Sequence, residues 1–384
     1  MTAAVGHPGI TTGVDRRWVL PPSDTPAQQC HASSVLSVDG RLLCAWFAGT
    51  AEGTPDNRIW LAAADHTGRW QEPRPVAGEG TEAHWNPVLA AGPDGSVWLF
   101  YKRGPAISAW QTWVRVSRDA GRTWSGAREL VPGDSGGRGP VKNPPVLLPD
   151  GGWLAPGSEE RWLPGGAVWD CFADRSDDGG TTWAKAPIPV DRAGLSGAGV
   201  IQPSLWTKGG TVGALMRSSE GFAYAAESTD GGRTFSPAQP TNLPNNNSGL
   251  TVAPIGEDLL ACVHNPVAES WGPRCPLAVS FSTDGTRWGP PALVLEDGRT
   301  PLEGIFPAVS GSGSRMETRT QAAGFEPRDT GVVTDGRGEY SYPSATLHGD
   351  QLIVTYTWQR RGIVSAALPL AALRLAAARA AALL

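Results

Sequence analysis

Side chains able to form hydrogen bonds or transfer protons stand at the start of six apolar segments that lie far apart in the sequence. Histidine and tyrosine can act as acid, base or nucleophile, while amides and lysine can hold a substrate. This first set consists of His31, His84, Asn86, Lys142, Asn143, Gln202, Asn247 and Tyr342. If the chain gathers these residues, they could bind and transform a polar molecule.

A second set of polar and aromatic residues stands at the ends of later apolar segments. It consists of Lys102, Glu159, Glu160, Arg217, His264, Asn265, Trp358 and Arg360. Lys102, Lys142, Arg217 and Arg360 would bring several cations together in a chain whose net charge is −5. Because lysine and arginine bind carboxylates through charge-assisted hydrogen bonds, these cations favour an anionic substrate.

A repeated turn indicates how the chain could gather these residues. The complete copies start at Ser117, Ser176 and Ser228, a shortened copy starts at Ser282, and a degenerate copy starts at Asp65. Their acidic position recurs in steps of 54, 59, 52 and 54 residues. In each copy the Asp can cap backbone N–H groups, a Gly can adopt positive φ, and an aromatic residue can enter the core. We expect these Asp residues to be structural.

A pair of apolar strands joined by a Gly-containing turn interleaves with the repeated turn and occurs six times. Each unit of about 50–60 residues is a small antiparallel sheet that cannot bury both of its faces alone. Six such units favour an all-β, six-bladed β-propeller over residues 16–365, with a sandwich of two halves as the alternative. The remaining predictions are a disordered N-terminus at 1–15, a surface insertion at 299–338 and a C-terminal helix at 366–384.

The propeller would bring both sets of residues to one end of its axis. Strands of a blade are antiparallel, so the start of the first strand and the end of the second share one rim. The first strands line the axis, so the residues form rings around the channel mouth. Among the 17 tryptophans, Trp85, Trp358 and Trp46 would lie near this rim.

Four short segments carry a resemblance to a known family. They are His31-Ala-Ser33, Trp85-Asn86-Pro87, Asn246-Asn247-Ser248-Gly249 and Tyr340-Ser-Tyr342-Pro343. With the repeated turn, which is the Asp-box, they make the chain resemble the sialidase (neuraminidase) superfamily. The chain is similar in particular to its bacterial "predicted neuraminidase" group with BNR repeats, over roughly residues 25–365. The resemblance implies a six-bladed propeller and a glycosidase of exo-alpha-sialidase type, although Asp-boxes also occur in other propellers.

The resemblance assigns roles to several residues. Sialidases bind the substrate carboxylate with three arginines and use a tyrosine nucleophile, a glutamate that activates it, and an aspartate as acid and base. Arg217 and Arg274 fall at the second and third arginine positions, and Tyr342 falls at the nucleophile position. Glu52 falls near the acid/base position, with Asp56 as a second candidate.

Two positions depart from the family pattern. His31 stands where the first arginine is expected, and Gln202 stands where the activating glutamate is expected. Because a neutral amide cannot take the phenol proton, Tyr342 would need another base, with Glu339 and Glu159 as candidates. The departures put ordinary sialic acid hydrolysis in question.

Three functions remain open from the sequence. The first is an exo-glycosidase that removes a terminal nonulosonic or uronic acid, with Arg217 and Arg274 on the carboxylate. The second is a uronate lyase, in which His31 or His84 abstracts a proton and Tyr342 donates one to the leaving group. The third is a propeller that binds glycans without catalysis.

Composition excludes several other classes. The net charge offers no basic field for nucleic acid, and no apolar run is long enough to span a membrane. The five cysteines form no CxxC pair, and the first ten residues lack the features of a secretory signal, so we expect a cytoplasmic protein with reduced thiols. Neither a metal site nor a cofactor is expected. Gly133–Gly139 is glycine-rich but lacks the Lys-Ser/Thr of a phosphate-binding loop, and we expect it to be flexible.

Overall fold

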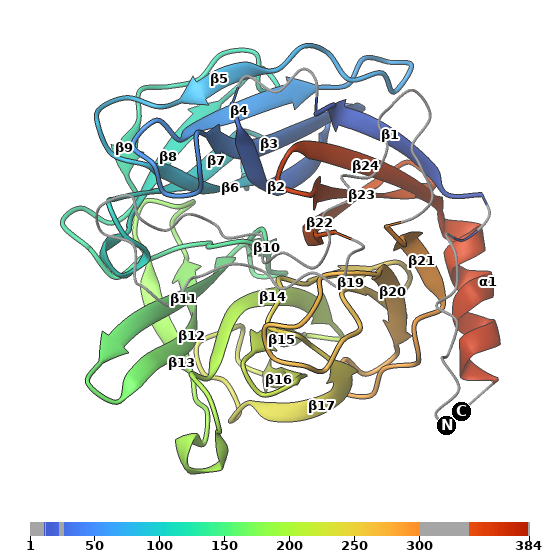
Figure 1. Ribbon diagram of the computed structural model, residues 1–384. Coiled ribbons are helices and arrows are strands. Elements are labelled where there is room, and N and C mark those ends of the chain that lie inside the picture. Colours follow the sequence, from blue (N-terminus) through green and yellow to red (C-terminus); the bar gives the residue numbers. More distant parts are fainter. Residues whose placement is uncertain (1–10, 12, 23–26, 299–337, 383–384) are drawn as a thin grey trace.

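Six four-stranded antiparallel sheets surround a common axis in the computed structural model of the chain (Figure 1). The structure describes residues 11, 13–22, 27–298 and 338–382. The arrangement confirms the predicted six-bladed β-propeller, and the sandwich alternative is wrong. Residues 1–10 and 12, together with 299–337, lie outside the described residues, so the predictions made for the N-terminus and the insertion concern parts that the structure does not describe.

The blades follow one another along the chain. Blade 1 contains β2 (Gln29–Val38), β3 (Arg41–Gly49), β4 (Arg58–Ala63) and β5 (Arg74–Ala77). Blade 2 contains β6 (His84–Ala91), β7 (Val97–Arg103), β8 (Gln111–Ser117) and β9 (Arg128–Glu129). Blade 3 contains β10 (Val146–Leu147), β11 (Trp153–Leu163), β12 (Gly166–Ser176) and β13 (Ala184–Ile188). Two short 3₁₀ helices, η1 (Ile107–Ala109) and η2 (Arg192–Gly194), lie in the connections between strands.

The second half of the wheel repeats this pattern. Blade 4 contains β14 (Val200–Lys208), β15 (Thr211–Ser218), β16 (Phe222–Ser228) and β17 (Gln239–Pro244). Blade 5 contains β18 (Thr251–Pro254), β19 (Leu260–His264), β20 (Leu277–Ser282) and β21 (Leu293–Glu296). Blade 6 contains β22 (Tyr340–His348), β23 (Gln351–Trp358) and β24 (Gly362–Pro369), and its fourth strand is β1 (Asp15–Leu20).

The closure of the wheel joins the two ends of the propeller sequence. β1 pairs antiparallel with β24, from Asp15 opposite Ala367 to Leu20 opposite Ile363. The C-terminal helix α1 (Leu370–Ala381) packs against β24 and β20 outside the sheets (Figure 1). The helix therefore begins four residues after the predicted start at 366, because residues 366–369 continue the ladder of β24 instead.

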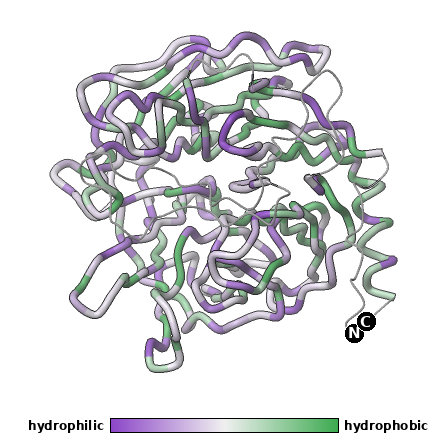
Figure 2. The backbone as a smooth tube through the Cα atoms, viewed as in Figure 1, coloured by the Kyte–Doolittle hydropathy of each residue, from purple (hydrophilic) through white to green (hydrophobic). Residues whose placement is uncertain are grey.

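Apolar side chains fill the spaces between neighbouring blades. Between blades 2 and 3, the rings of Trp98 and Trp153 lie 5.1 Å apart, and those of Trp153 and Trp183 lie 5.6 Å apart. Hydrophobic stretches recur along the strands in Figure 2, as expected for sheets covered on both faces. The core is thus distributed around the wheel, and the axis is left to polar residues.

The Asp-box turns have the structural role predicted for them. Asp230 Oδ1 accepts hydrogen bonds from Ser228 Oγ at 2.8 Å and from the backbone N–H of Thr234 at 2.9 Å. The same contacts recur at Asp119 and Asp178. These turns follow the third strand of their blades, so strand alternation places them at the end of the wheel opposite the start of the first strands.

Candidate active site

The first strands of four blades break their pairing at the end of the wheel that carries the polar residues. The register shifts lie between His31 and Ser34, Trp85 and Val88, Ile201 and Ser204, and Ser341 and Ser344. A non-glycine residue with positive φ occupies each bulge: Ala32 at 54°, Asn86 at 40°, Gln202 at 54° and Tyr342 at 54°. Such conformations cost of order 1–3 kcal/mol each and cluster at functional sites.

The bulges of blades 4 and 6 bring Tyr342 and Gln202 together with Arg217. Arg217 Nη1 donates to Tyr342 Oη at 2.7 Å and to Gln202 Oε1 at 3.0 Å, while its Nε donates to Asn247 Oδ1 at 2.7 Å. Gln202 Nε2 also donates to Tyr342 Oη, at 3.3 Å. Two N–H donors therefore converge on the phenol oxygen, an arrangement that stabilises negative charge there.

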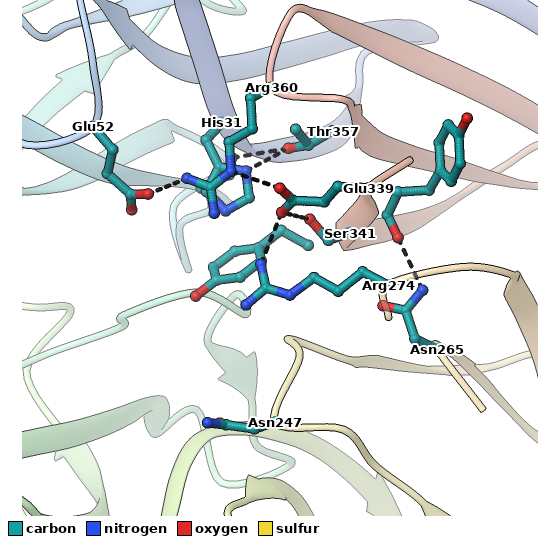
Figure 3. Close-up of polar contacts among 12 residues, drawn as sticks. His31, Glu52, Asn247, Asn265, Arg274, Glu339, Ser341, Thr357 and Arg360 are labelled. Atoms are coloured by element: carbon teal, nitrogen blue, oxygen red, sulfur yellow. Dashed lines mark hydrogen bonds and ion pairs between the residues drawn. The ribbon is translucent and has the colours of Figure 1, made fainter. Parts of the chain in front are cut away.

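A buried carboxylate joins two further arginines beside Tyr342. Arg274 Nη1 donates to Glu339 Oε1 at 2.8 Å, and Arg360 Nε donates to Glu339 Oε2 at 3.0 Å (Figure 3). Arg360 Nη1 also forms an ion pair with Glu52. The guanidinium carbon of Arg274 lies 5.6 Å from the centre of the Tyr342 ring, and that of Arg217 lies 5.8 Å from it. Three arginines from blades 4, 5 and 6 thus gather around one tyrosine.

Electrostatics explain how three cations and a carboxylate share a buried space. Burial alone would raise the pKa of Glu339, but Arg360 and Arg274 outweigh it and hold that pKa well below its usual range. Burial would lower the pKa of Arg360, but Glu339 and Glu52 raise it above its usual value. Burial lowers the pKa of Arg274, although Glu339 opposes the shift. Glu339 therefore stays ionised and keeps both guanidinium groups in place.

His31 lies against Tyr342 on the blade 1 side. Their ring centres are 4.3 Å apart, and His31 Nδ1 lies 2.9 Å from Thr357 Oγ1. His31 Nε2 is buried and has no hydrogen-bond partner among the described residues. Burial first, and then the charge of Arg360, hold the pKa of His31 well below its usual value, so the imidazole is neutral at pH 7.

Lys142 and Asn143 lie buried next to Tyr342 and tie first strands together. Lys142 Nζ donates to the carbonyl oxygens of Leu250 and Pro343, and to Asn143 Oδ1 at 3.1 Å. Asn143 Nδ2 donates to the carbonyl oxygens of Pro203 at 3.0 Å and Leu250 at 3.1 Å. Their polar groups are engaged by blades 4, 5 and 6, so in this structure they hold the site together.

The structure therefore brings together eight of the residues predicted for the site. They are His31, Glu52, Gln202, Arg217, Asn247, Arg274, Tyr342 and Arg360, with Lys142 and Asn143 directly beside them. The eight residues come from blades 1, 4, 5 and 6, and Lys142 and Asn143 precede the first strand of blade 3. We call these eight residues, together with Glu339, the Tyr342 cluster.

Other predicted site residues make contacts elsewhere. Lys102 is fully buried and donates to Thr112 Oγ1 at 2.7 Å and to the carbonyl oxygens of Gly137 and Arg138. It anchors the glycine-rich loop 133–139, and Asp174 Oδ2 accepts from the Gly139 N–H at 2.6 Å. These hydrogen bonds hold residues 137–139 of the loop, and the flexibility expected for the loop stays a prediction.

The remaining predicted residues make their contacts outside the Tyr342 cluster. His84 stacks on Tyr101, His264 bonds to Ser280, and Trp358 packs on Trp18. Asn86 Nδ2 donates to the Val141 carbonyl oxygen at 3.1 Å. Two acidic residues have local partners: Glu159 pairs with Lys185, and Asp56 accepts from Thr50 and Thr54. Trp46 and Trp85 are buried, so neither presents its ring to a ligand at the rim.

Some residues around the Tyr342 cluster received no role in the sequence prediction. In that prediction Glu339 is a candidate base only, Glu160 belongs to the second set without a role of its own, and Thr357 and Trp169 have no part. The Trp169 ring lies 5.8 Å from the guanidinium carbon of Arg217. A sequence signal was present, because Asn86, Asn143, Gln202 and Tyr342 each precede a proline at the same place in their blades. This repeated dipeptide marks three of the four bulges.

Three further features concern other kinds of site. No group of three or more His, Cys, Asp or Glu side chains is arranged to hold a metal ion within the described ranges. The five cysteines are buried and form no disulfide. In the described part of the chain, no helix has both the length and the apolar character needed to cross a membrane.

Comparisons with known proteins agree with this fold. The sequence matches the BNR repeat-like domain over residues 40–354, so the chain belongs to that family. None of the curated proteins matches the chain. A protein of unknown function from Dyadobacter fermentans superposes with a TM-score of 0.62 at 15% identity, covering 94% of this chain and 100% of that one.

Sialidases are also among the similar structures. The chain superposes on Trypanosoma rangeli sialidase in complex with sialic acid with a TM-score of 0.64 at 14% identity, covering 96% of this chain and 61% of that one. A variant of the NanB sialidase from Streptococcus pneumoniae gives a TM-score of 0.61 at 11% identity, with 90% and 69% covered. The chain thus has a sialidase-like BNR propeller fold and spans about three fifths of the trypanosomal chain.

Proposed function

We propose that the protein is an exo-acting glycosidase that removes a terminal acidic sugar, a nonulosonic or uronic acid, from a glycan. The observation that carries the proposal is the convergence of Arg217, Arg274 and Arg360 around the partly exposed ring of Tyr342. Arginine presents five N–H donors in a fixed plane, and Glu339 uses only one donor of each of its two partners. Donors therefore remain for the carboxylate of a substrate.

Arg360 supplies the cation that the sequence comparison lacked at His31. It approaches from the end of blade 6, and its charge strongly affects the neighbouring imidazole. His31 is neutral and does not replace an arginine electrostatically. Arg360 of blade 6 thus supplies the third arginine, which the family pattern places in blade 1 at the position of His31.

Tyr342 acts at the anomeric carbon in this proposal. Gln202 cannot accept the phenol proton, and the two candidate bases are engaged: Glu339 by arginines and Glu159 by Lys185. Arg217 and Gln202 instead donate to Oη and stabilise the oxygen as an anion. Electrostatic stabilisation of this kind replaces a dedicated base.

The proposal is tested with a panel of 4-methylumbelliferyl glycosides of nonulosonic and uronic acids, together with the matching neutral sugars. The purified protein is expected to release the fluorophore from at least one acidic member, with products that gain the mass of one water. Arg217→Met should abolish the preference for the acidic over the neutral member. Absence of release across the panel by folded protein overturns the proposal.

Elimination from a uronate is a second candidate, favoured by one observation. His31 is neutral and carries a buried, unpartnered Nε2 beside Tyr342, as a proton acceptor would. Elimination adds no water and gives an unsaturated product that absorbs in the near ultraviolet. The same panel, read by mass and absorbance with uronate oligosaccharides included, separates the two reactions. Saturable binding without any product would indicate a glycan-binding propeller.

A further inference from the structure

One acidic side chain near the Tyr342 cluster differs from the others in its surroundings. Glu52, Glu159 and Glu339 are each held in an ion pair, and Asp56 accepts hydrogen bonds from threonines. Protonating any of the four would cost these contacts. Glu160 forms no ion pair with Lys or Arg in the part of the chain that the structure describes.

The position of Glu160 links it to Tyr342 through Arg217. Glu160 lies on β11 directly opposite Trp169 of β12. The Trp169 ring lies 5.8 Å from the guanidinium carbon of Arg217, which donates to Tyr342 Oη. Burial raises the pKa of Glu160 above its ordinary value, although the charge of Arg217 opposes the shift.

A cavity of about 190 Å³ adjoins Glu160 between blades 2 and 3. Trp110, Val141 and the loop residues 135–137 line it together with Glu160. The loop is fixed there because Lys102 donates to the Gly137 carbonyl oxygen. Cavities of about 300–1,000 Å³ hold drug-sized ligands, so this smaller space suits a single sugar ring.

We propose that Glu160 is the proton donor to the leaving group and that the adjoining cavity receives the sugar that leaves. This inference rests on the proposed glycosidase function and deepens it. The two carboxyl groups have different roles because their environments differ: Glu339 stays ionised among arginines, and Glu160 can carry a proton. The acid therefore comes from blade 3, whereas the sequence comparison placed it in blade 1 at Glu52 or Asp56.

The reaction balances with these groups and solvent water. Tyr342 Oη forms a bond to the anomeric carbon, and the phenol proton passes to solvent water. The glycosidic C–O bond breaks, its electron pair stays on the leaving oxygen, and the Glu160 proton moves to that oxygen to give an alcohol. In the second step a water attacks the anomeric carbon and gives a proton to the Glu160 carboxylate, which restores the acid. The bond to Tyr342 Oη breaks, and this oxygen takes up a proton from solvent.

The test compares two substrates that carry the acidic sugar turned over in the panel. One is its 4-nitrophenyl glycoside, whose leaving group departs without a proton, and the other is its disaccharide with a neutral sugar. Glu160→Gln should lower kcat/KM for the disaccharide by about 10²–10⁴-fold and for the nitrophenyl glycoside by less than about fivefold. The alkaline limb of the disaccharide pH profile should disappear.

Glu257→Gln is the matched control, because Glu257 is exposed in the turn between β18 and β19. Equal loss on both substrates, no loss on the disaccharide, or a substrate-dependent loss in Glu52→Gln instead would each overturn the inference. If Glu160→Gln does not fold, the wild-type profiles decide: an alkaline limb for the disaccharide alone supports Glu160, and identical limbs overturn it. An inactive wild type overturns the glycosidase proposal and this inference together, whereas an active wild type with an unaffected Glu160→Gln overturns this inference alone.

Discussion

Arg217 Nη1 donates a hydrogen bond of 2.7 Å to Tyr342 Oη, although 125 residues separate the two in the sequence. Arg217 lies on β15 of blade 4 and Tyr342 on the bulge of β22 in blade 6. Blade 5 lies between them in the chain, so the contact spans the axis region that the first strands surround. It places a fixed cation on the oxygen that would react.

Tyr342→Phe removes this oxygen and keeps the ring. Release from the acidic glycoside should fall by at least about 100-fold, because the group that acts at the anomeric carbon is lost. Binding of the free acidic sugar should change by only a few fold, since the three arginines remain. Kinetics of fluorophore release and calorimetric titration measure the two effects. Tyr224→Phe in the core of blade 4 is the control, and a parallel loss of binding in Tyr342→Phe would contradict the assignment.

Glu339→Gln should destabilise the fold strongly. Glu339 is 1% exposed, and the substitution leaves Arg274 and Arg360 without their shared carboxylate. Removing one partner of a buried ion pair costs about 3–5 kcal/mol in free energy of unfolding. Urea denaturation checks the value, with Glu257→Gln expected to stay within about 0.5 kcal/mol of wild type. A change below about 1 kcal/mol would show that the guanidinium groups do not depend on Glu339.

The sequence predicted the wheel well because its repeated turn is a local device. Asp230 caps its own turn, and Gly232 must have positive φ and lie against blade 3, where a Cβ would approach Leu154 Cδ2 to 2.4 Å. The Asp and Gly that meet these requirements lie within one eight-residue turn, so they can be recognised in the sequence. The number of blades and the end of the wheel that carries the polar residues follow from these repeats and from strand alternation.

The detailed contacts of the site depend on packing between blades, which the sequence does not display. Lys102 and Arg360 both stand at the ends of second strands, yet Lys102 turns to the loop 133–139 and Arg360 to Glu339. Glu339 and Arg274 are 65 residues apart, and they meet only because blades 5 and 6 are neighbours. The bulges decide which side chains reach the axis, and their positive φ values were not predicted.

Histidines buried in neutral form should make the protein less stable in mild acid. The pKa of His31 is held well below its usual value by burial and then by Arg360, and burial lowers the pKa of His264 to about 4. Below about pH 6.5 these histidines bind protons in the unfolded chain but not in the folded chain. The free energy of unfolding therefore falls as pH falls, by up to about 1.4 kcal/mol per pH unit for each histidine.

His31→Asn tests the contribution of one of these residues. Urea denaturation between pH 6.5 and 5 should show a slope of unfolding free energy against pH that is smaller than that of wild type by up to about 1.4 kcal/mol per pH unit. His66→Asn, at an exposed position, should keep the wild-type slope. An unchanged slope in His31→Asn would mean that His31 takes up a proton in the folded state.

Lys142 should also make the stability of the protein depend on pH, in a higher pH range than the histidines. It is buried beside Tyr342 with only carbonyl and amide oxygens around its ammonium group, and burial lowers its pKa to about 7. The unfolded side chain has a pKa of about 10.4. Between these values the unfolded chain binds more protons than the folded chain, so this residue makes stability rise as pH rises above 7 and is without effect on the slope well below 7.

Lys142→Met removes this titration and leaves the chain with a similar side-chain length. Between pH 7 and 8 the variant should show an unfolding free energy whose slope against pH is lower than that of wild type by up to about 1.4 kcal/mol per pH unit. The range stops at pH 8 because the buried thiols, such as Cys262, have raised pKa values and reverse the trend once unfolded cysteines ionise. Lys208→Met, at a surface ion pair with Asp258, is the matched control. Equal slopes in Lys142→Met and wild type would show that Lys142 keeps its proton throughout this range, and that the first strands of blades 3, 5 and 6 are joined by a permanently charged ammonium group.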